Sequence, residues 1–224
     1  MMQKKNIIIS LIVSLIFLFY MIFDYVGYIR YLKLHLYSVE SYTKRYTNLE
    51  KADKSRVIVC FKYNDSNFKN LKPFLNSILD STVRVDDISI CMPYKNIKNI
   101  PSDMKTVLSI VGSSLNKDNI DLQYSILKEP ENNTKIIIVE PGFVYEKDFI
   151  ERMVEESNSN PDKIILSKKG IVIKPEFFSF DDDAGMCLKN NNECFSSRDW
   201  LEKCNKKKKK INDGTLKQSS FLIV

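Results

Sequence analysis

The sequence predicts an α/β body attached to an N-terminal membrane helix. Short runs of branched apolar residues alternate with segments whose apolar residues recur at helical spacing. This alternation indicates a mostly parallel sheet with helices on both faces. Ahead of it, residues 7–23 carry no charged side chain. With 44% hydrophobic and 28% charged residues, the composition is that of a folded protein and excludes wholesale disorder.

The uncharged N-terminal segment has the length of a membrane anchor. A bilayer core needs about 20 apolar residues, and residues 26–29 extend the stretch beyond Asp24. A cleaved signal peptide is the alternative, but it has a shorter apolar region and ends at a pair of small residues. Residues 24–28 are mostly bulky. We therefore expect an uncleaved, single-pass signal anchor over residues 7–29, after a short tail of residues 1–6.

The charges beside the anchor bear on its orientation. Two lysines precede it, and Arg30 and Lys33 follow it, so the counts on the two sides are nearly equal. We expect the N-terminus inside and the body in the lumenal or extracytoplasmic space. There, the sequons at Asn64 and Asn132 would be available for glycosylation, which would make the chain a glycoprotein.

Residues 30–55 connect the anchor to the body. They are rich in charges of both signs, and Leu32, Leu36 and Val39 recur at helical spacing. We expect this segment to be a helical stem that holds the body off the membrane.

The body is expected over residues 56–211, followed by a C-terminal tail of residues 212–224. Its elements are predicted from apolar runs and periodicity. The expected helices begin at residues 71 and 149, and a hairpin is one arrangement open to the last two strands. The expected strands cover residues 57–61, 88–92, 106–111, 135–139, 163–166 and 170–173. Because such sheets bind ligands beyond the carboxyl ends of their strands, residues 62–67, 92–95 and 140–145 are the informative positions.

The composition also excludes several kinds of site. His35 is the single histidine, which rules out a zinc site built on several histidines and argues against a histidine-based triad. The net charge is +6, but residues 206–210 are five consecutive lysines. The rest of the chain is close to neutral, so we expect no nucleic-acid partner.

A series of motifs in the body resembles a known family. The segments in question are residues 56–61, residues 71–78, VRVDDI at 83–88, MPY at 92–94, IIIVEPGFVY at 136–145, residues 170–178 and CFSSRDW at 194–200. In this order they resemble the motifs of family 2-like glycosyltransferases of the GT-A fold, including type II membrane-anchored forms. The resemblance covers residues 56 to about 211 and rests on the order of the motifs more than on any one of them.

The resemblance implies a nucleotide-sugar donor and a divalent metal, Mn²⁺ or Mg²⁺. In these enzymes an Asp-x-Asp motif after the central strand binds the metal, which neutralises the leaving diphosphate. Here the motif is replaced by Glu140-Pro141-Gly142, so Glu140 is the implied metal ligand. The next two residues bring no second oxygen side chain.

The resemblance also implies the other site residues. Asp199 corresponds to the base that deprotonates the acceptor hydroxyl, and the loop at Tyr63 and Asn64 corresponds to the nucleotide contact. Arg198, beside Asp199, favours the charged carboxylate and lowers its basicity. The altered metal motif leaves a second hypothesis open. In that hypothesis the chain is a catalytically inactive membrane protein that keeps the fold as a binding or assembly scaffold.

Two further features have ordinary interpretations. The acidic run at residues 181–183 is expected to be an exposed turn, with metal binding as the lesser alternative. Cys60 and Cys91 lie in predicted core strands and are expected to be buried. In a lumenal body, a bridge between Cys187 and Cys194 would close a small loop.

Overall fold

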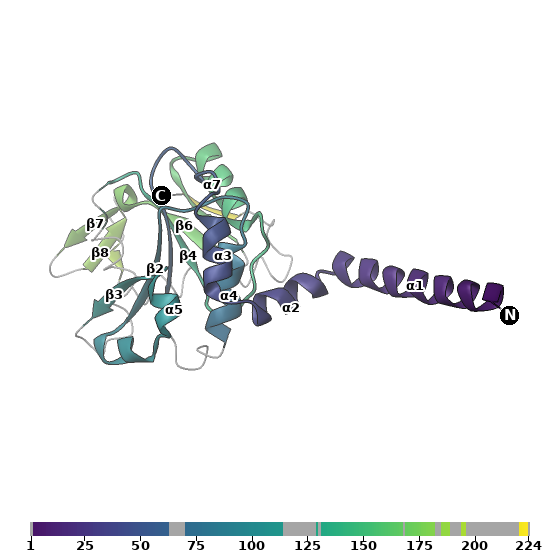
Figure 1. Ribbon diagram of the computed structural model, residues 1–224. Coiled ribbons are helices and arrows are strands. Elements are labelled where there is room, and N and C mark those ends of the chain that lie inside the picture. Colours follow the sequence, from purple (N-terminus) through teal and green to yellow (C-terminus); the bar gives the residue numbers. More distant parts are fainter. Residues whose placement is uncertain are drawn as a thin grey trace.

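The chain combines a long N-terminal helix with an α/β body (Figure 1). The computed structural model describes residues 2–62, 70–113, 129, 131–167, 169–181, 185–188, 194–195 and 220–223. Tyr63, Asn64 and Asp199, which the resemblance implies as site residues, lie outside these ranges.

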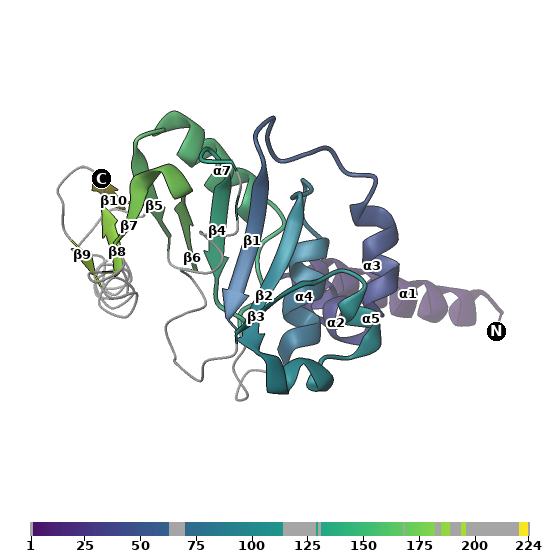
Figure 2. The same cartoon turned by 90° about the vertical axis from the view of Figure 1, so that its left-hand side faces the viewer.

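A seven-stranded sheet forms the centre of the body (Figure 2). Its order is β10-β5-β6-β4-β1-β2-β3. Strands β1 to β4 run parallel, β6 is antiparallel to β4 and β5, and β10 is antiparallel to β5. The predicted α/β class with a mostly parallel sheet is therefore confirmed. The strands are β1 (Val57–Lys62), β2 (Asp87–Pro93), β3 (Ser109–Ser113), β4 (Lys135–Val139), β5 (Lys163–Leu166), β6 (Gly170–Ile173) and β10 (Ser220–Ile223).

Alternating side chains give the sheet two apolar faces. On β1, Val59 and Phe61 join the larger cluster, whereas Ile58 and Cys60 join the smaller one. The larger cluster is covered by the helices α2 (Tyr28–Leu36), α3 (Val39–Tyr46), α4 (Leu71–Leu79), α5 (Ser102–Lys105) and α7 (Phe149–Ser159). In the described residues, no α-helix contributes to the smaller cluster, which instead includes the end of the 3-10 helix η3 (Pro175–Phe177).

Two cysteines of the smaller cluster are buried, and this burial was predicted. Cys60 of β1 and Cys91 of β2 have their Sγ atoms 3.3 Å apart. A separate three-stranded sheet consists of β7 (Phe178–Asp181), β8 (Gly185–Leu188) and β9 (Cys194–Phe195). In its register Cys187 lies opposite Cys194, and the bridge between them stays a prediction. Of the acidic run at residues 181–183, expected to be a turn, Asp181 is the last residue of β7, and residues 182 and 183 lie outside the described residues.

The third strand begins later than predicted. It starts at Ser109, not at residue 106, because α5 and the turn after it occupy residues 102–107. The carbonyl of Met104 accepts hydrogen bonds from the amides of Val107 and Leu108, so these residues close a helical turn. The 3-10 helix η2 (Tyr94–Asn99) precedes this segment.

Helix α1 (Met2–Tyr25) projects from the body with its apolar side chains exposed. Every large apolar side chain from Ile9 to Phe23 is 45–65% exposed. Gly27, at a φ of +75°, separates α1 from α2 (Tyr28–Leu36), and the two helices are bent by 78°. By length and composition, no single helix in the described residues qualifies as a membrane span, but residues 9–25 and α2 qualify together as a bent pair.

The segment expected to be a stem instead packs on the body. Helices α2 and α3 (Val39–Tyr46) lie against α4, and we call residues 28–46 the collar. Its side chains Leu34, Val39, Tyr42 and Tyr46 belong to the larger core cluster. Ser38 caps α3 by accepting a hydrogen bond from the amide of Ser41. The collar is folded against the body because its apolar positions are buried there.

Buried polar groups fix the collar in place. The side-chain amide of Asn76, on α4, donates hydrogen bonds to the carbonyls of Leu34 at 2.8 Å and Tyr37 at 3.2 Å. The hydroxyl of Tyr46 accepts a hydrogen bond from the amide of Val85 at 2.8 Å. These bonds give partners to the side-chain NH2 of Asn76 and to the amide of Val85, which would otherwise be buried without them. They therefore fix the position of the collar on the body.

Candidate functional site

The strand order reverses between β1 and β4. From β1 the chain passes through α4 to β2 and on to β3, and it then returns to β4 on the other side of β1. In open α/β sheets, ligands bind at such a reversal, outside the carboxyl ends of the strands. We call this place, between the end of β1 at Lys62 and the end of β4 at Val139, the switch-point edge.

Glu140 lies at the switch-point edge. Phe61 on β1 is the register partner of Val139 on β4, so Lys62 and Glu140 follow on neighbouring strands. Both side chains are exposed. The structure thus places the implied metal ligand where the fold would hold a ligand, and residues 63 and 64 follow β1 directly in sequence.

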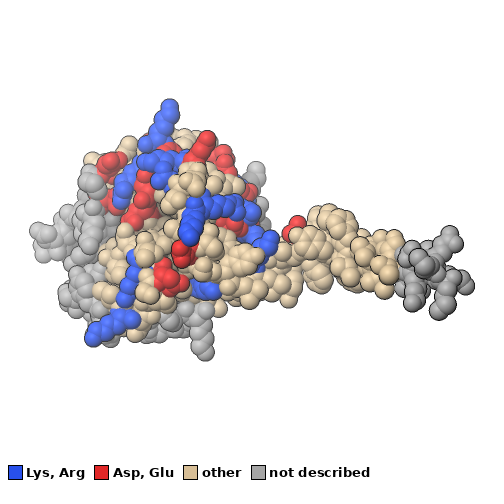
Figure 3. Space-filling view, viewed as in Figure 1, with Lys and Arg blue, Asp and Glu red and all other residues tan. Residues whose placement is uncertain are grey.

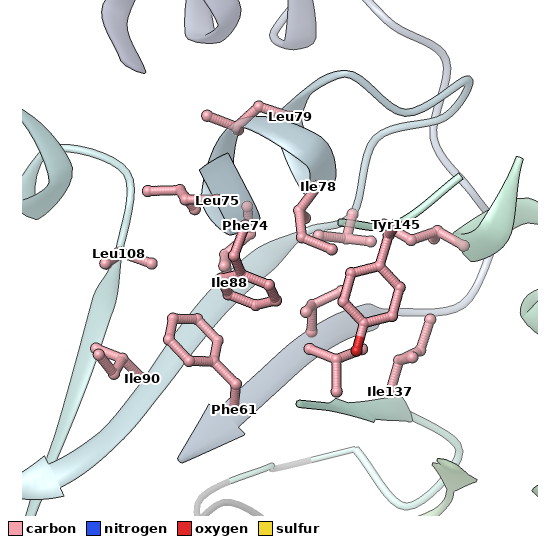
Figure 4. Close-up of a cluster of buried hydrophobic side chains, with 14 of the residues drawn as sticks. Phe61, Phe74, Leu75, Ile78, Leu79, Ile88, Ile90, Leu108, Ile137 and Tyr145 are labelled. Carbon is pink, nitrogen blue, oxygen red and sulfur yellow. The ribbon is translucent and has the colours of Figure 1, made fainter. Parts of the chain in front are cut away.

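A buried tyrosine organises the loop that carries Glu140. The hydroxyl of Tyr145 accepts a hydrogen bond from the amide of Glu140 at 2.9 Å and donates one to the carbonyl of Lys169 at 2.8 Å. Its ring, 1% exposed, packs against Phe74 and Phe149 (Figure 4). Burial raises the pKa of Tyr145 well above its usual range, so the hydroxyl stays protonated.

The sequence motif includes Tyr145 but does not predict that its hydroxyl holds the backbone of Glu140. The available signal was an aromatic residue with a polar tip five positions after Glu140. Such a residue fits a core position that also needs one hydrogen bond.

Positive charge lies beside Glu140. Gly170, the first residue of β6, is opposite Val139, so Lys169 precedes β6 at the same edge. The Lys169 ammonium lies 3.4 Å from the carbonyl of Val144. It also lies 3.9 Å from the carboxylate of Glu146, which compensates part of its charge, and Lys62 is the second lysine at this edge.

Gly170 is required by close packing at this edge. A Cβ added there would lie 2.9 Å from a ring carbon of Phe149 and 3.2 Å from the carbonyl oxygen of Ile138. A larger residue would force the Phe149 ring to move and would crowd the backbone of β4.

The described residues supply only part of a metal site. Glu140 offers one carboxylate, and neither Pro141 nor Gly142 adds an oxygen side chain. Among the residues whose side chains are described, no three His, Cys, Asp or Glu side chains lie close enough to share a metal ion. This donor set does not fit a divalent metal by itself.

A buried ion pair lies at the opposite edge of the sheet, at the start of β4. The ammonium of Lys135 donates hydrogen bonds to the carboxylate of Asp53 and to the hydroxyl of Ser55, each at 2.7 Å. Burial opposes the charged form of Asp53, but hydrogen bonds from Lys135, Asn158 and the Ser55 amide outweigh it and hold the pKa of Asp53 well below its usual range. These charges pair with one another, which indicates a structural role.

Comparison with known proteins adds no family assignment. No family model matches the chain, and no curated protein matches it. The function is therefore argued from the fold and from the switch-point edge.

Proposed function

We propose that this chain is a membrane-anchored, glycosyltransferase-like protein of the GT-A fold. It binds a nucleotide sugar at the switch-point edge and transfers the sugar to a hydroxyl acceptor. The observation that carries the proposal is the position of Glu140 after β4, next to the end of β1. This is where a fold of this class binds a ligand, and it is also where the sequence motifs put the donor.

The residues at the edge suit a diphosphate. Lys62 and Lys169 bring positive charge, and Tyr145 holds the backbone of Glu140 in one place. Glu140 would be one ligand of a divalent ion, which would need further ligands because the described donor set does not fit it by itself; such an ion would supply positive charge to the diphosphate. Tyr63 and Asn64 as nucleotide contacts, and Asp199 as the base, complete the proposal from the sequence.

The membrane part of the proposal depends on α1. The uncharged part of α1, residues 7–23, is about 26 Å long, which is shorter than a hydrocarbon core of about 30 Å, so the proposed anchor also includes the start of α2. The surface of α1 is almost free of charged side chains where it is described (Figure 3). So long an exposed apolar surface needs an apolar environment, and a bilayer provides one.

The collar would then lie at the membrane surface. Tyr28, Leu32 and Leu36 recur every four residues along α2, and all three are exposed on the side away from the buried Leu34. An apolar stripe on a helix that follows a membrane span fits the lipid interface. We propose that the body lies directly on the bilayer, on its lumenal or extracytoplasmic side.

A catalytically inactive scaffold is the second candidate. The observation that favours it is the Glu140-Pro141-Gly142 motif, which has one carboxylate where the family has two. A single carboxylate weakens the attraction for a divalent cation. The fold and the membrane anchor would be retained in this case, and donor binding would be absent.

Donor binding distinguishes the two candidates. Thermal unfolding of the full-length chain in nanodiscs is measured with UDP- and GDP-sugars, with and without Mn²⁺. The full chain is needed because Leu34 and Val39 of the collar belong to the core. A bound donor stabilises the folded state by mass action, by about 2.7 kcal/mol at a hundredfold excess over Kd.

We expect a Mn²⁺-dependent rise in Tm with one class of donor. The rise should be lost in Glu140→Gln and kept in Glu155→Gln, which alters an exposed carboxylate on α7. Release of the nucleoside diphosphate in the presence of an acceptor would then report transfer. If no donor shifts the Tm of a chain that unfolds cooperatively, the transferase proposal fails and the scaffold remains.

A further inference from the structure

A basic pocket lies where α1 meets the body. It has a volume of about 400 Å³ and lies between the end of α1, the collar and the end of α4. Four cationic side chains and two carboxylates line it. They are Arg30, Lys33, Arg45, Lys147, Asp24 and Asp80. Two positive charges are therefore in excess.

Asp80 neutralises only part of this charge. Its carboxylate, 6% exposed, accepts a hydrogen bond from Arg30 Nε at 2.8 Å and another from Arg45 Nη1 at 3.0 Å. The ammonium of Lys147 lies farther away, at 3.9 Å. Both oxygens of Asp80 are thus bound by guanidinium groups, while Lys33 and Lys147 remain exposed at the rim.

Arg30 is held rigidly at the base of the pocket. Besides its bond to Asp80, its Nη1 donates to the carbonyl of Tyr145 at 2.9 Å. Its Nη2 is buried and has no hydrogen-bond partner among the described residues, so the exposed cations Lys33, Arg45 and Lys147 are the groups that an anion in the pocket could reach.

The position of the pocket indicates the source of that anion. Asp24 lies in the last turn of α1 and also lines the pocket. If α1 crosses the bilayer, the pocket opens at the depth of the lipid head groups. The hydroxyl of Tyr37 lies along the same wall and adds a neutral hydrogen-bond donor, whereas the hydroxyl of Ser41 donates to the carbonyl of Ser38 at 2.7 Å. Figure 3 shows Lys and Arg on the body beside the base of α1.

We propose that this pocket binds the phosphate of an anionic membrane lipid. The inference rests on the membrane part of the proposed function and is independent of donor binding. The exposed lysines attract the phosphate, and Arg45 and the hydroxyl of Tyr37 hold it. The bound lipid thereby links the collar and the bilayer at one point.

The test uses the full-length chain in nanodiscs. Thermal unfolding is measured in phosphatidylcholine alone, in phosphatidylcholine mixed with phosphatidylglycerol, and in phosphatidylcholine with added inorganic phosphate. We expect phosphatidylglycerol to raise Tm by roughly 3 °C or more. The double variant Lys33→Gln with Lys147→Gln should lose this rise, because it removes the excess charge and leaves both arginine contacts to Asp80 in place.

The control variant carries Lys98→Gln and Lys105→Gln, two exposed lysines outside the pocket. It should keep the rise, and an equal loss in both variants would overturn the site. A rise with inorganic phosphate in neutral nanodiscs supports the site and identifies free phosphate as its ligand. No rise with either anion overturns the inference.

Failure of the membrane proposal has a separate signature. A chain that does not incorporate into nanodiscs contradicts the membrane anchor, and the lipid site with it. A chain that incorporates and shows no response to either anion contradicts the lipid site alone. Donor binding is scored separately by the response to nucleotide sugars.

Discussion

Helix α1 and the collar are neighbours in sequence, yet their apolar side chains have opposite surroundings. Those of α1 are about half exposed, whereas Leu34 and Val39 of the collar are fully buried. The change occurs at Gly27, whose positive φ lets the chain turn between α1 and α2. The boundary between anchor and body therefore lies at the start of the collar and not at residue 55.

The difference arises from what each helix meets. The collar faces α4, which offers an apolar surface together with Asn76 and is directly followed by Asp80, and both of these groups find partners in the collar. Over residues 9–23, α1 presents apolar side chains, Tyr20 and two serines. The apolar side chains of the collar are therefore buried beside polar partners on the body, whereas those of α1 are exposed and have no such partners among the described residues.

The collar also connects to the candidate site. Arg30 bonds to the carboxylate of Asp80 and to the backbone of Tyr145, and Tyr145 in turn holds Glu140. Hydrogen bonds to the backbone and to the side chain of Tyr145 therefore link α2 to the switch-point edge. A free stem would provide no such connection.

Asp80→Asn should break the collar side of this comparison. The substitution leaves Arg30 and Arg45 without their buried carboxylate, and because both arginines are partly exposed, the loss of these charge-assisted hydrogen bonds should cost about 2–3 kcal/mol. Chemical unfolding of the full-length chain measures the free energy. The matched control is Asp162→Asn, an exposed carboxylate after α7, which should change stability little. Equal stability of the two variants would mean that the collar is not held by Asp80.

An effect of similar size is expected from Tyr46 at high pH. Burial raises the pKa of Tyr46 to about 12, although the hydrogen bond from the Val85 amide and the charge of Arg84 act in the opposite direction. Because the folded pKa exceeds the unfolded value of about 10, this contribution to stability is complete below pH 10. It is lost as pH rises through 12.

The variant Tyr46→Phe isolates this titration. Between pH 9 and pH 12 the wild-type chain should lose about 2–3 kcal/mol more stability than the variant, since each unit of pKa shift corresponds to about 1.4 kcal/mol. Urea unfolding at a series of pH values measures the difference. Parallel pH curves for the two chains would show that Tyr46 is not buried in the folded state, and hence that α3 does not pack on the body.

The strands of the body could be predicted because each depends on a local pattern. Residues 57–61 and 135–139 are branched apolar runs, and both form strands. The start of β3 could not be predicted, because the turn at the end of α5 competes for residues 106–108. The collar could not be predicted either, since its partners are Asn76 on α4 and Asp80 directly after α4, tens of residues away along the chain.

For the candidate site, the position of Glu140 could be predicted and its support could not. Glu140 directly follows an obvious strand, so its place at the carboxyl edge follows from the fold class. The bonds of Tyr145 to Glu140 and Lys169 depend on β6 returning beside β4, which is a long-range event. Tyr63, Asn64 and Asp199 stay predictions, since they lie outside the described residues.

The central claim is that the collar belongs to the folded body and holds it at the membrane. Hydrogen exchange of the full-length chain in nanodiscs tests this most directly, because amides of a cooperatively folded unit open together. We predict that the amides of α2 and α3 are protected to the same degree as those of α4, and that those of residues 9–25 are protected by the bilayer. Rapid exchange throughout residues 28–46, beside a protected α4, would contradict the account and restore a free stem.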